Sequence, residues 1–150
     1  MRLGEHVTPV VEQLAMFLKD RDHNANARRL MAEALWKLGE LAAPAAPVLA
    51  AALADTKPQA EKRAVHEEGD CKVRFAAAMA LGKVGEHAAP FVEHLRRALS
   101  DIDEEVRRAA AITLGGLGKH AMLCIPDLEE LWASDDDHEV RRAALKALNK

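Results

Sequence analysis

Apolar and polar positions recur along the chain in a fixed order. A segment that begins with Val or Ala, continues with Arg and an alanine-rich apolar run, and closes with Gly occupies residues 27–39, 73–85 and 106–118, and a fourth copy begins at 140. The copies start 46, 33 and 34 residues apart, so the period is about 33 residues with one insertion of 13. A period of this length predicts a solenoid of stacked helical units.

The first helix of each unit has recognisable start and stop residues. A short polar residue lies three positions before each copy, where its side chain can accept hydrogen bonds from the free N–H groups of a first helical turn. These residues are Asn24, Asp70, Asp103 and Asp137. The copies close at Gly39, Gly85 and Gly118, and glycine most easily adopts the left-handed conformation that follows a helix. We expect one helix between each start and stop.

The segment after each glycine predicts a second helix. Counted from the glycine, apolar residues recur at the sixth, seventh and tenth positions, which lie on one face of a helix. They are Val10, Ala45, Phe91 and Cys124, then Val11, Ala46, Val92 and Ile125, then Leu14, Leu49, Leu95 and Leu128. Pro9, Pro44 and Pro90 fall early in these segments, where a helix tolerates proline.

These patterns predict one all-α domain over residues 1–150, with about four helix pairs and eight helices. Composition agrees, because the chain has no Tyr and only 3% aromatic residues, whereas sheets favour β-branched and aromatic side chains. A polar insertion at about 56–69 joins one pair to the next. The end helices lack the polar outer face of capping repeats, which is consistent with a segment of a longer array or with self-association through the ends.

The motif Asp-x-x-Val-Arg-x-x-Ala-Ala-x-x-Leu-Gly-x-x-Gly, present at 70–85 and 103–118, resembles HEAT-like repeats of the phycobilisome-lyase type. The resemblance implies a right-handed α-α superhelix, with the first helix of each pair on the convex side and the second on the concave side. Our leading hypothesis is therefore a non-catalytic scaffold that binds a protein or peptide along its concave surface.

Bulk properties narrow the range of partners. A net charge of -3 and a pI near 6.2 give no general attraction to nucleic acid or to anionic membranes. No apolar run approaches the roughly 20 residues of a membrane span. Cys71 and Cys124 do not make a disulfide framework. The helix N-terminus and Lys72 act to lower the pKa of Cys71, but we expect a lone thiol without a histidine partner in its motif to be inert. We expect a soluble, cytoplasmic protein without a cofactor.

One arginine recurs at the same position in every copy. The four are Arg28, Arg74, Arg107 and Arg141, and acidic residues that include Asp101 and Asp135 recur five residues before each copy. Arginines in register would suit a phosphate-binding strip, but the accompanying acids favour a structural ladder between neighbouring units. An exposed pair contributes at most about 1 kcal/mol, so we expect the ladder to fix the stacking register more than the overall stability.

Positions that differ between copies carry the hypothesis for binding. The eighth, ninth and twelfth positions after the glycine should face the concave groove, and we select Pro47, Val48, Ala51, Glu93, His94 and Arg97. From Leu41 to Ala54 there is no charged or polar side chain. Such a helix requires a cover, unless its exposed methyl groups are only those of weakly apolar alanines. We expect affinity from Val48 and Ala51, and polar selectivity from His94 and Arg97.

One alternative is a bilin lyase-like or chromophore-handling subunit. Its tetrapyrrole carboxylates would require Arg96 or Arg97, and its ring system would require an apolar groove wall. The sequence offers no aromatic groove residues for such a ligand.

A metal-dependent hydroxylase of the HEAT-like type is the less favoured alternative. That family carries symmetric His-Glu pairs, whereas His66–Glu67 lies in the insertion and His138–Glu139 precedes its repeat. A histidine also follows the glycine in three units, at His6, His87 and His120. Packed helices lie about 8–10 Å apart, too far for such residues to share one ion easily. We expect no catalytic residue and no metal site.

Overall fold

The computed structural model describes residues 3–20, 23–54 and 68–150, and all regular structure in these ranges is helical. The α-helices are α1 (Leu3–Lys19), α2 (Ala25–Leu38), α3 (Ala46–Leu53), α4 (Glu68–Lys83), α5 (Val92–Ala98), α6 (Glu104–Leu117), α7 (Ile125–Ser134) and α8 (His138–Leu148). Three 3-10 segments are η1 (Gly39–Ala45), η3 (Gly85–Phe91) and η4 (Gly118–Cys124). Most of the predicted insertion at 56–69 lies outside the described residues. No helix in the described ranges is both long and apolar enough to span a bilayer.

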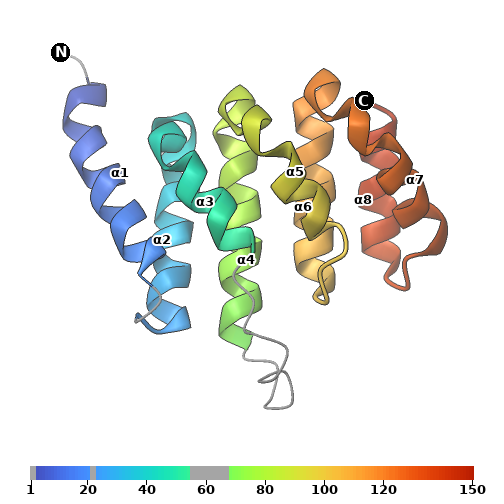
Figure 1. Cartoon of the computed structure of the whole chain (residues 1–150), viewed down its shortest axis with the longest axis horizontal. Helices are drawn as coiled ribbons and strands as arrows, with labels where there is room; N and C mark the ends of the chain where they lie inside the picture. Colours follow the sequence, from blue (N-terminus) through green and yellow to red (C-terminus); the bar gives the residue numbers. More distant parts are fainter. Residues whose placement is uncertain (1–2, 21–22, 55–67) are drawn as a thin grey trace.

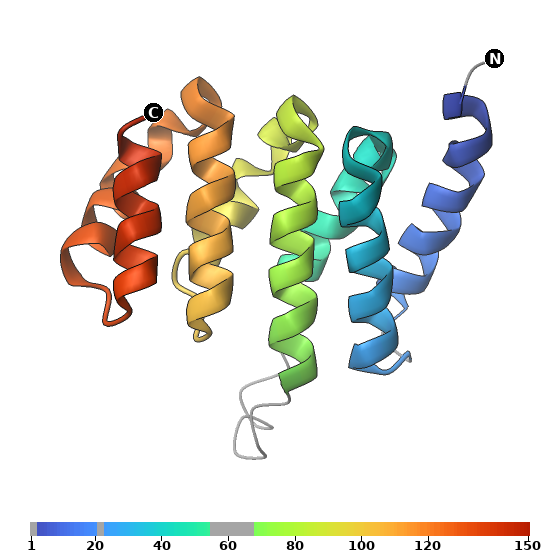
Figure 2. The same cartoon turned by 180° about the vertical axis from the view of Figure 1, so that it is seen from behind.

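The helices form two rows that stack along the length of the molecule. The odd row, α1, α3, α5 and α7, faces the viewer in Figure 1, and the even row, α2, α4, α6 and α8, faces the viewer in Figure 2. In the even row each helix packs extensively on the next, whereas α5 and α7 of the odd row hardly touch. The even row is therefore the more closely packed side of the array.

Alanine explains the close packing of the even row. Ala76, Ala77 and Ala78 of α4 and Ala109, Ala110 and Ala111 of α6 are all buried. Because a methyl group is the smallest apolar side chain, helices that present alanines to both neighbours approach more closely than leucine-lined helices. Larger side chains, including Leu81, Leu114 and Leu95, are fully buried between the two rows.

The ends of the even helices follow the predicted residues, with one exception. The side chains of Asn24, Asp103 and Asp137 each accept a hydrogen bond from the backbone N–H three residues later. The closing glycines Gly39, Gly85 and Gly118 adopt positive φ angles of 59°, 63° and 52°. The exception is Asp70, which lies inside α4 because this helix begins at Glu68.

The second helix of each pair starts later than predicted. After each glycine the chain first forms η1, η3 or η4, and α3, α5 and α7 begin at Ala46, Val92 and Ile125. Proline alone does not explain this, because η4 contains none. By contrast, α1 continues unbroken through Pro9.

Two of the predicted core residues are exposed in the structure. Val10 is 48% exposed and Ile125 is 40% exposed, whereas Ala45 and Cys124 are fully buried. Val10 belongs to a continuous α-helix and Ala45 to a 3-10 segment, so the same distance from glycine gives a different orientation.

Gly115 and Gly116 form a matched pair for testing the close approach of α6 and α8. A Cβ atom at Gly115 would lie 2.9 Å from Cα of Ala147, whereas one at Gly116 would meet nothing within 4 Å. We expect Gly115→Ala to lower the free energy of unfolding by about 1–3 kcal/mol, because α8 must shift. Gly116→Ala should raise it by up to about 1 kcal/mol, since alanine is the better helix former. Urea denaturation followed by circular dichroism measures both, and equal effects would contradict this packing.

Candidate functional site

Two of the recurring arginines, Arg74 and Arg107, join consecutive repeats through carboxylates in the loops. Arg74 on α4 donates from Nε and Nη2 to the two carboxylate oxygens of Asp101, at 2.8 and 2.9 Å. Asp101 lies in the loop before α6, and the two side chains are only 5% and 6% exposed. The sequence led us to expect exposed pairs. Burial changes their energetics, because removing one partner from a buried pair leaves an uncompensated charge and costs about 3–5 kcal/mol.

Arg107 repeats this arrangement one unit later. Its Nε and Nη2 donate to Asp135 at 2.8 and 3.0 Å, while Nη1 donates to the backbone carbonyl of Asp101 at 2.9 Å. One guanidinium thus connects the loop before its own helix to the loop before the next helix. Asp135 also accepts from the backbone N–H of Asp137, the N-cap of α8.

The outer members of the ladder make different contacts. Arg28 on α2 donates from Nε to the carbonyl of Leu18 at 3.0 Å, and Arg141 on α8 donates to the carbonyls of Asp135 and Asp136. The guanidinium groups of Arg74 and Arg107 are already paired with carboxylates of the protein. These two arginines are therefore not available as a phosphate-binding strip.

The residues that the sequence selected for partner binding lie in the odd row. Pro47, Val48 and Ala51 are on α3, and Glu93, His94 and Arg97 are on α5, which packs beside α3. Pro47 and Ala51 are exposed, and Val48 is half-buried. Glu93 and Arg97 form an ion pair at 3.8 Å, while the ring of His94 lies 5.9 Å from that of Phe91. The fold thus brings the six residues onto two neighbouring helices of one row.

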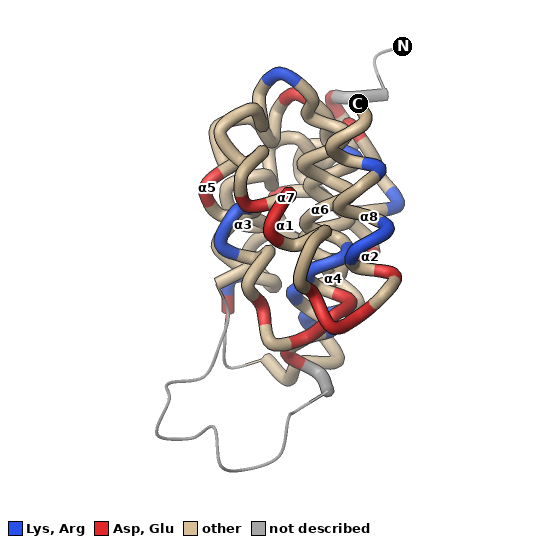
Figure 3. Tube along the Cα trace, turned by 90° about the vertical axis from the view of Figure 1, so that its right-hand side faces the viewer, with Lys and Arg blue, Asp and Glu red and all other residues tan. Residues whose placement is uncertain are grey.

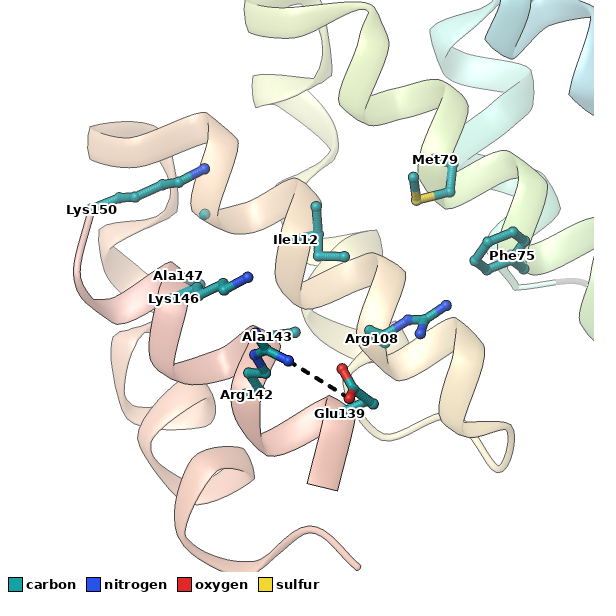
Figure 4. Close-up of a pocket in the computed structure, with 11 residues that line it drawn as sticks. Phe75, Met79, Arg108, Ile112, Glu139, Arg142, Ala143, Lys146, Ala147 and Lys150 are labelled. Carbon is teal, nitrogen blue, oxygen red and sulfur yellow. Dashed lines mark ion pairs between the residues drawn. The ribbon is translucent and has the colours of Figure 1, made fainter. Parts of the chain in front are cut away.

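The described residues form a groove on the opposite side, along the outer face of the even row (Figure 4). It has a volume of about 460 Å³ and crosses α4, α6 and α8. Its lining residues are Phe75, Met79, Arg108, Ile112, Gly115, Glu139, Arg142, Ala143, Lys146, Ala147 and Lys150. None of the six odd-row residues lines it.

The groove combines an apolar floor with a charged rim. Phe75 and Met79 are half-buried, and Ile112 is 46% exposed. The ring of Phe75 also meets Trp36 of α2 edge-on, with 6.3 Å between ring centroids. Uncovered side chains of this size, surrounded by charges, are typical of surfaces that bind other molecules.

Ion pairs occupy part of the rim. Arg108 pairs with Glu105 on the same helix, and Arg142 lies 3.9 Å from Glu139, the contact dashed in Figure 4. Lys146 and Lys150 are exposed and form no ion pair with the described residues. Within the described residues, Lys146 and Lys150 are therefore the two basic side chains of the rim that no acid of the protein neutralises.

The sequence contains a signal for this groove in the first helix of each pair. Phe75, Arg108 and Arg142 occupy one position of the repeat, and Met79, Ile112 and Lys146 occupy another. Both positions vary between copies, whereas the neighbouring Val, Arg, Ala and Leu positions recur. The binding hypothesis from the sequence rested on variation in the second helix of each pair, and so it missed the groove on the first.

The histidines and cysteines form no cluster in the described residues. His6, His87 and His120 are exposed, and no group of three metal-ligating side chains occurs in these ranges. His66–Glu67 lies outside the described residues, and His138 meets Glu139 at 3.0 Å on the surface.

The environment of Cys71 acts against activation of its thiol. Burial raises the pKa of the Cys71 thiol, and the nearby charge and hydrogen bond of Asp103 raise it further. These effects outweigh the charge of Arg74 and the backbone N–H of Lys72, which both lower it. The thiol form is therefore favoured, although Cys71 lies in the first turn of α4.

Comparisons with known proteins identify a family and similar structures for this architecture. The family described as HEAT repeats matches residues 63–149. A chain in the complex of CpcE and CpcF of phycocyanin lyase from Nostoc sp. PCC7120 is similar with a TM-score of 0.70 and 25% identity, covering 97% of this chain and 82% of that chain. An engineered protein is similar with a TM-score of 0.68 and 22% identity over 91% of this chain, which spans 60% of that protein. No curated protein sequence matches.

Asp135 provides a test of the ladder through pH. Burial would raise the pKa of Asp135, but hydrogen bonds from Arg107 and the Asp137 backbone, with the charges of Arg107 and Arg141, hold it below its ordinary value of 3.8. An acid with a depressed folded-state pKa stabilises the fold above its unfolded pKa. That stabilisation disappears as the pH falls through the folded pKa. Asp135→Asn should therefore lower the free energy of unfolding by about 2 kcal/mol at neutral pH. The difference in this free energy between the variant and the wild type should narrow below pH 3.8.

The neighbouring Asp136 is the control for this measurement, because its side chain is exposed. Asp136→Asn should change the free energy of unfolding at neutral pH by no more than about 0.5 kcal/mol in urea denaturation, as is usual for an exposed position. A constant difference between Asp135→Asn and the wild type across the acid range would show that the carboxylate does not titrate as described.

Proposed function

Because the chain belongs to the HEAT repeat family, we propose that it is a non-catalytic helical scaffold that binds a segment of a partner protein in the groove across α4, α6 and α8. The observation that carries the proposal is the groove itself, in which Phe75, Met79 and Ile112 remain partly uncovered on the outer face of the even row. A surface of this kind recognises shape and apolar side chains, and it requires no bond chemistry.

The division between constant and variable positions supports this proposal. The Leu position recurs in every repeat, and the Val position is buried and unchanged in the last three, since these residues maintain the packing of the rows. The groove positions change from aromatic to basic or from thioether to aliphatic along the array. Such variation gives each repeat a different contact surface on a common frame, which is how solenoids present extended binding faces.

The proposed geometry differs from the one implied by the family resemblance. We propose that the array coils as a right-handed superhelix whose inner side is the even row, where the contacts between successive helices are more extensive. The competing surface is the odd-row pair α3 and α5, with Val48, Ala51 and Arg97, which would then lie on the outer side. A cytoplasmic location, the absence of a cofactor and association between copies remain predictions.

A second candidate is a chromophore-handling role, which one comparison favours. The complex that contains a similar chain is that of CpcE and CpcF of phycocyanin lyase. In the present chain Arg96 donates to Asp127 at 2.8 Å and Arg97 lies 3.8 Å from Glu93. Both arginines would have to leave these acids to bind propionate groups, which weighs against this candidate.

Titration with a free bilin distinguishes the two roles. A chromophore-handling protein would change the visible absorption of the bilin at stoichiometric concentration, because a bound tetrapyrrole is held in a restricted conformation. We expect an unchanged spectrum. A saturable spectral change that Arg97→Ala removes would instead support the chromophore role.

Ile112→Glu and Ala51→Glu are matched tests of the proposed surface. Each places a carboxylate at an exposed position, the first in the even-row groove and the second on α3. We expect Ile112→Glu to weaken partner capture by a factor of about ten or more, the effect of losing a central apolar contact of about 2 kcal/mol. Ala51→Glu should retain capture. Affinity purification with quantitative mass spectrometry measures both.

Circular dichroism controls for folding, since both variants should keep the wild-type helix content. If Ala51→Glu loses the partner and Ile112→Glu keeps it, the binding surface is the odd row and the proposal is overturned.

A further inference from the structure

The groove rim has the opposite charge to the protein as a whole. The chain carries a formal net charge of -3, yet four of the lining residues are basic and Glu139 is the one acid among them. The bases are Arg108, Arg142, Lys146 and Lys150. They come from α6 and from α8 with the residues that follow it, and Figure 3 shows basic residues along α8. Charges arranged in this way attract anionic groups to the groove although the protein itself is acidic.

Two lysines on the rim are the basic residues that an incoming ligand can use, because acids in the described ranges do not pair with them. Glu105 and Glu139 already accompany Arg108 and Arg142. Lys146 lies in the last turn of α8 and Lys150 lies two residues beyond its end, and neither has such an acid among the described residues. Two such cations on one rim of the groove suit carboxylates along the polar flank of a facing helix.

The apolar floor of the groove favours a ligand that carries apolar groups beside these carboxylates. Phe75 and Met79 lie one turn apart on α4, and Ile112 faces them from α6 (Figure 4). Ala143 and Ala147 continue the apolar floor onto α8. Methionine adapts its shape to different side chains, and a line of apolar contacts at helical spacing accepts the apolar face of an amphipathic helix.

We propose that the groove binds an acidic amphipathic helix of a partner protein. Its carboxylates pair with Lys146 and Lys150, and its apolar face contacts Phe75, Met79 and Ile112. This inference rests on the proposed function, to which it adds the chemistry of the partner. A nucleic acid fits less well, because its phosphates would meet Glu139 and Glu105 along the rim and the apolar floor would have no counterpart.

A designed peptide tests the chemistry directly. The probe is about 15 residues long, with leucines at helical spacing and glutamates on the flanking positions. Matched peptides replace the glutamates with glutamine or lysine, or the leucines with serine. Trp36, which contacts Phe75 beside the groove, reports binding by fluorescence once Trp132→Phe has removed the second tryptophan. We expect the acidic peptide to bind in a salt-sensitive manner and the lysine and serine peptides to bind at least about tenfold more weakly.

Charge reversal on the protein tests whether the peptides bind in the groove. Lys146→Glu should lower the affinity for the acidic peptide by up to about fivefold, which is the effect of one exposed ion pair. The same substitution should raise the affinity for the lysine peptide. Lys119→Glu makes the same charge change on η4, outside the groove, and should leave both peptides unaffected. The two substitutions differ only in position, so a long-range effect of net charge would alter both equally.

The outcomes separate this inference from the proposed function. If the glutamine or lysine peptide binds as tightly as the acidic one and Ile112→Glu abolishes binding, the groove binds protein segments but the acidic partner is wrong. If no peptide responds to Ile112→Glu, both proposals fail. If light scattering shows that the chain alone forms dimers that Lys146→Glu dissociates, the occupant is a second copy and the inference is overturned.

Discussion

The guanidinium of Arg107 holds two loops at once, and the alignment of consecutive repeats depends on such contacts. Arg107 binds the carboxylate of Asp135 in the next loop and the carbonyl of Asp101 in its own loop. Asp135 in turn accepts from the N–H of the cap residue of α8. Because these bonds are directional, they select one register among the many that a smooth, alanine-lined interface would tolerate. Alanine supplies the close approach, and the ladder specifies where the helices stop relative to one another.

This arrangement separates structure from recognition within a single helix. One face of α6 buries Val106 and Leu114, and its flanks carry the ladder and the alanines. The remaining outward face is free to change without altering the packing, and Arg108 and Ile112 occupy it. The groove therefore arises where the repeat places no structural demand on the side chain. Its basic rim and apolar floor are properties of this chain, while the frame belongs to the family.

Much of the fold was predictable because its signals are local. A capping side chain such as Asp103 and a closing glycine such as Gly118 act within a few residues, so their positions in the sequence define the helix ends. Asp70 failed as a cap because α4 extends to Glu68. Val10 failed as a core residue because α1 lacks the 3-10 segment that precedes the other odd helices. The groove was not found because Phe75, Ile112 and Lys146 come from three repeats, and only stacking brings them together.

The most direct test of this account is a methyl NMR titration of the protein with its partner or with the acidic peptide. Met79 and Ile112 carry methyl groups in the groove, while Val48 and Ala51 carry them in the opposite row. The account predicts that the methyl signals of Met79 and Ile112 shift in a saturable manner while those of Val48 and Ala51 remain in place. Saturable shifts at Val48 and Ala51, with Met79 and Ile112 unchanged, would contradict it.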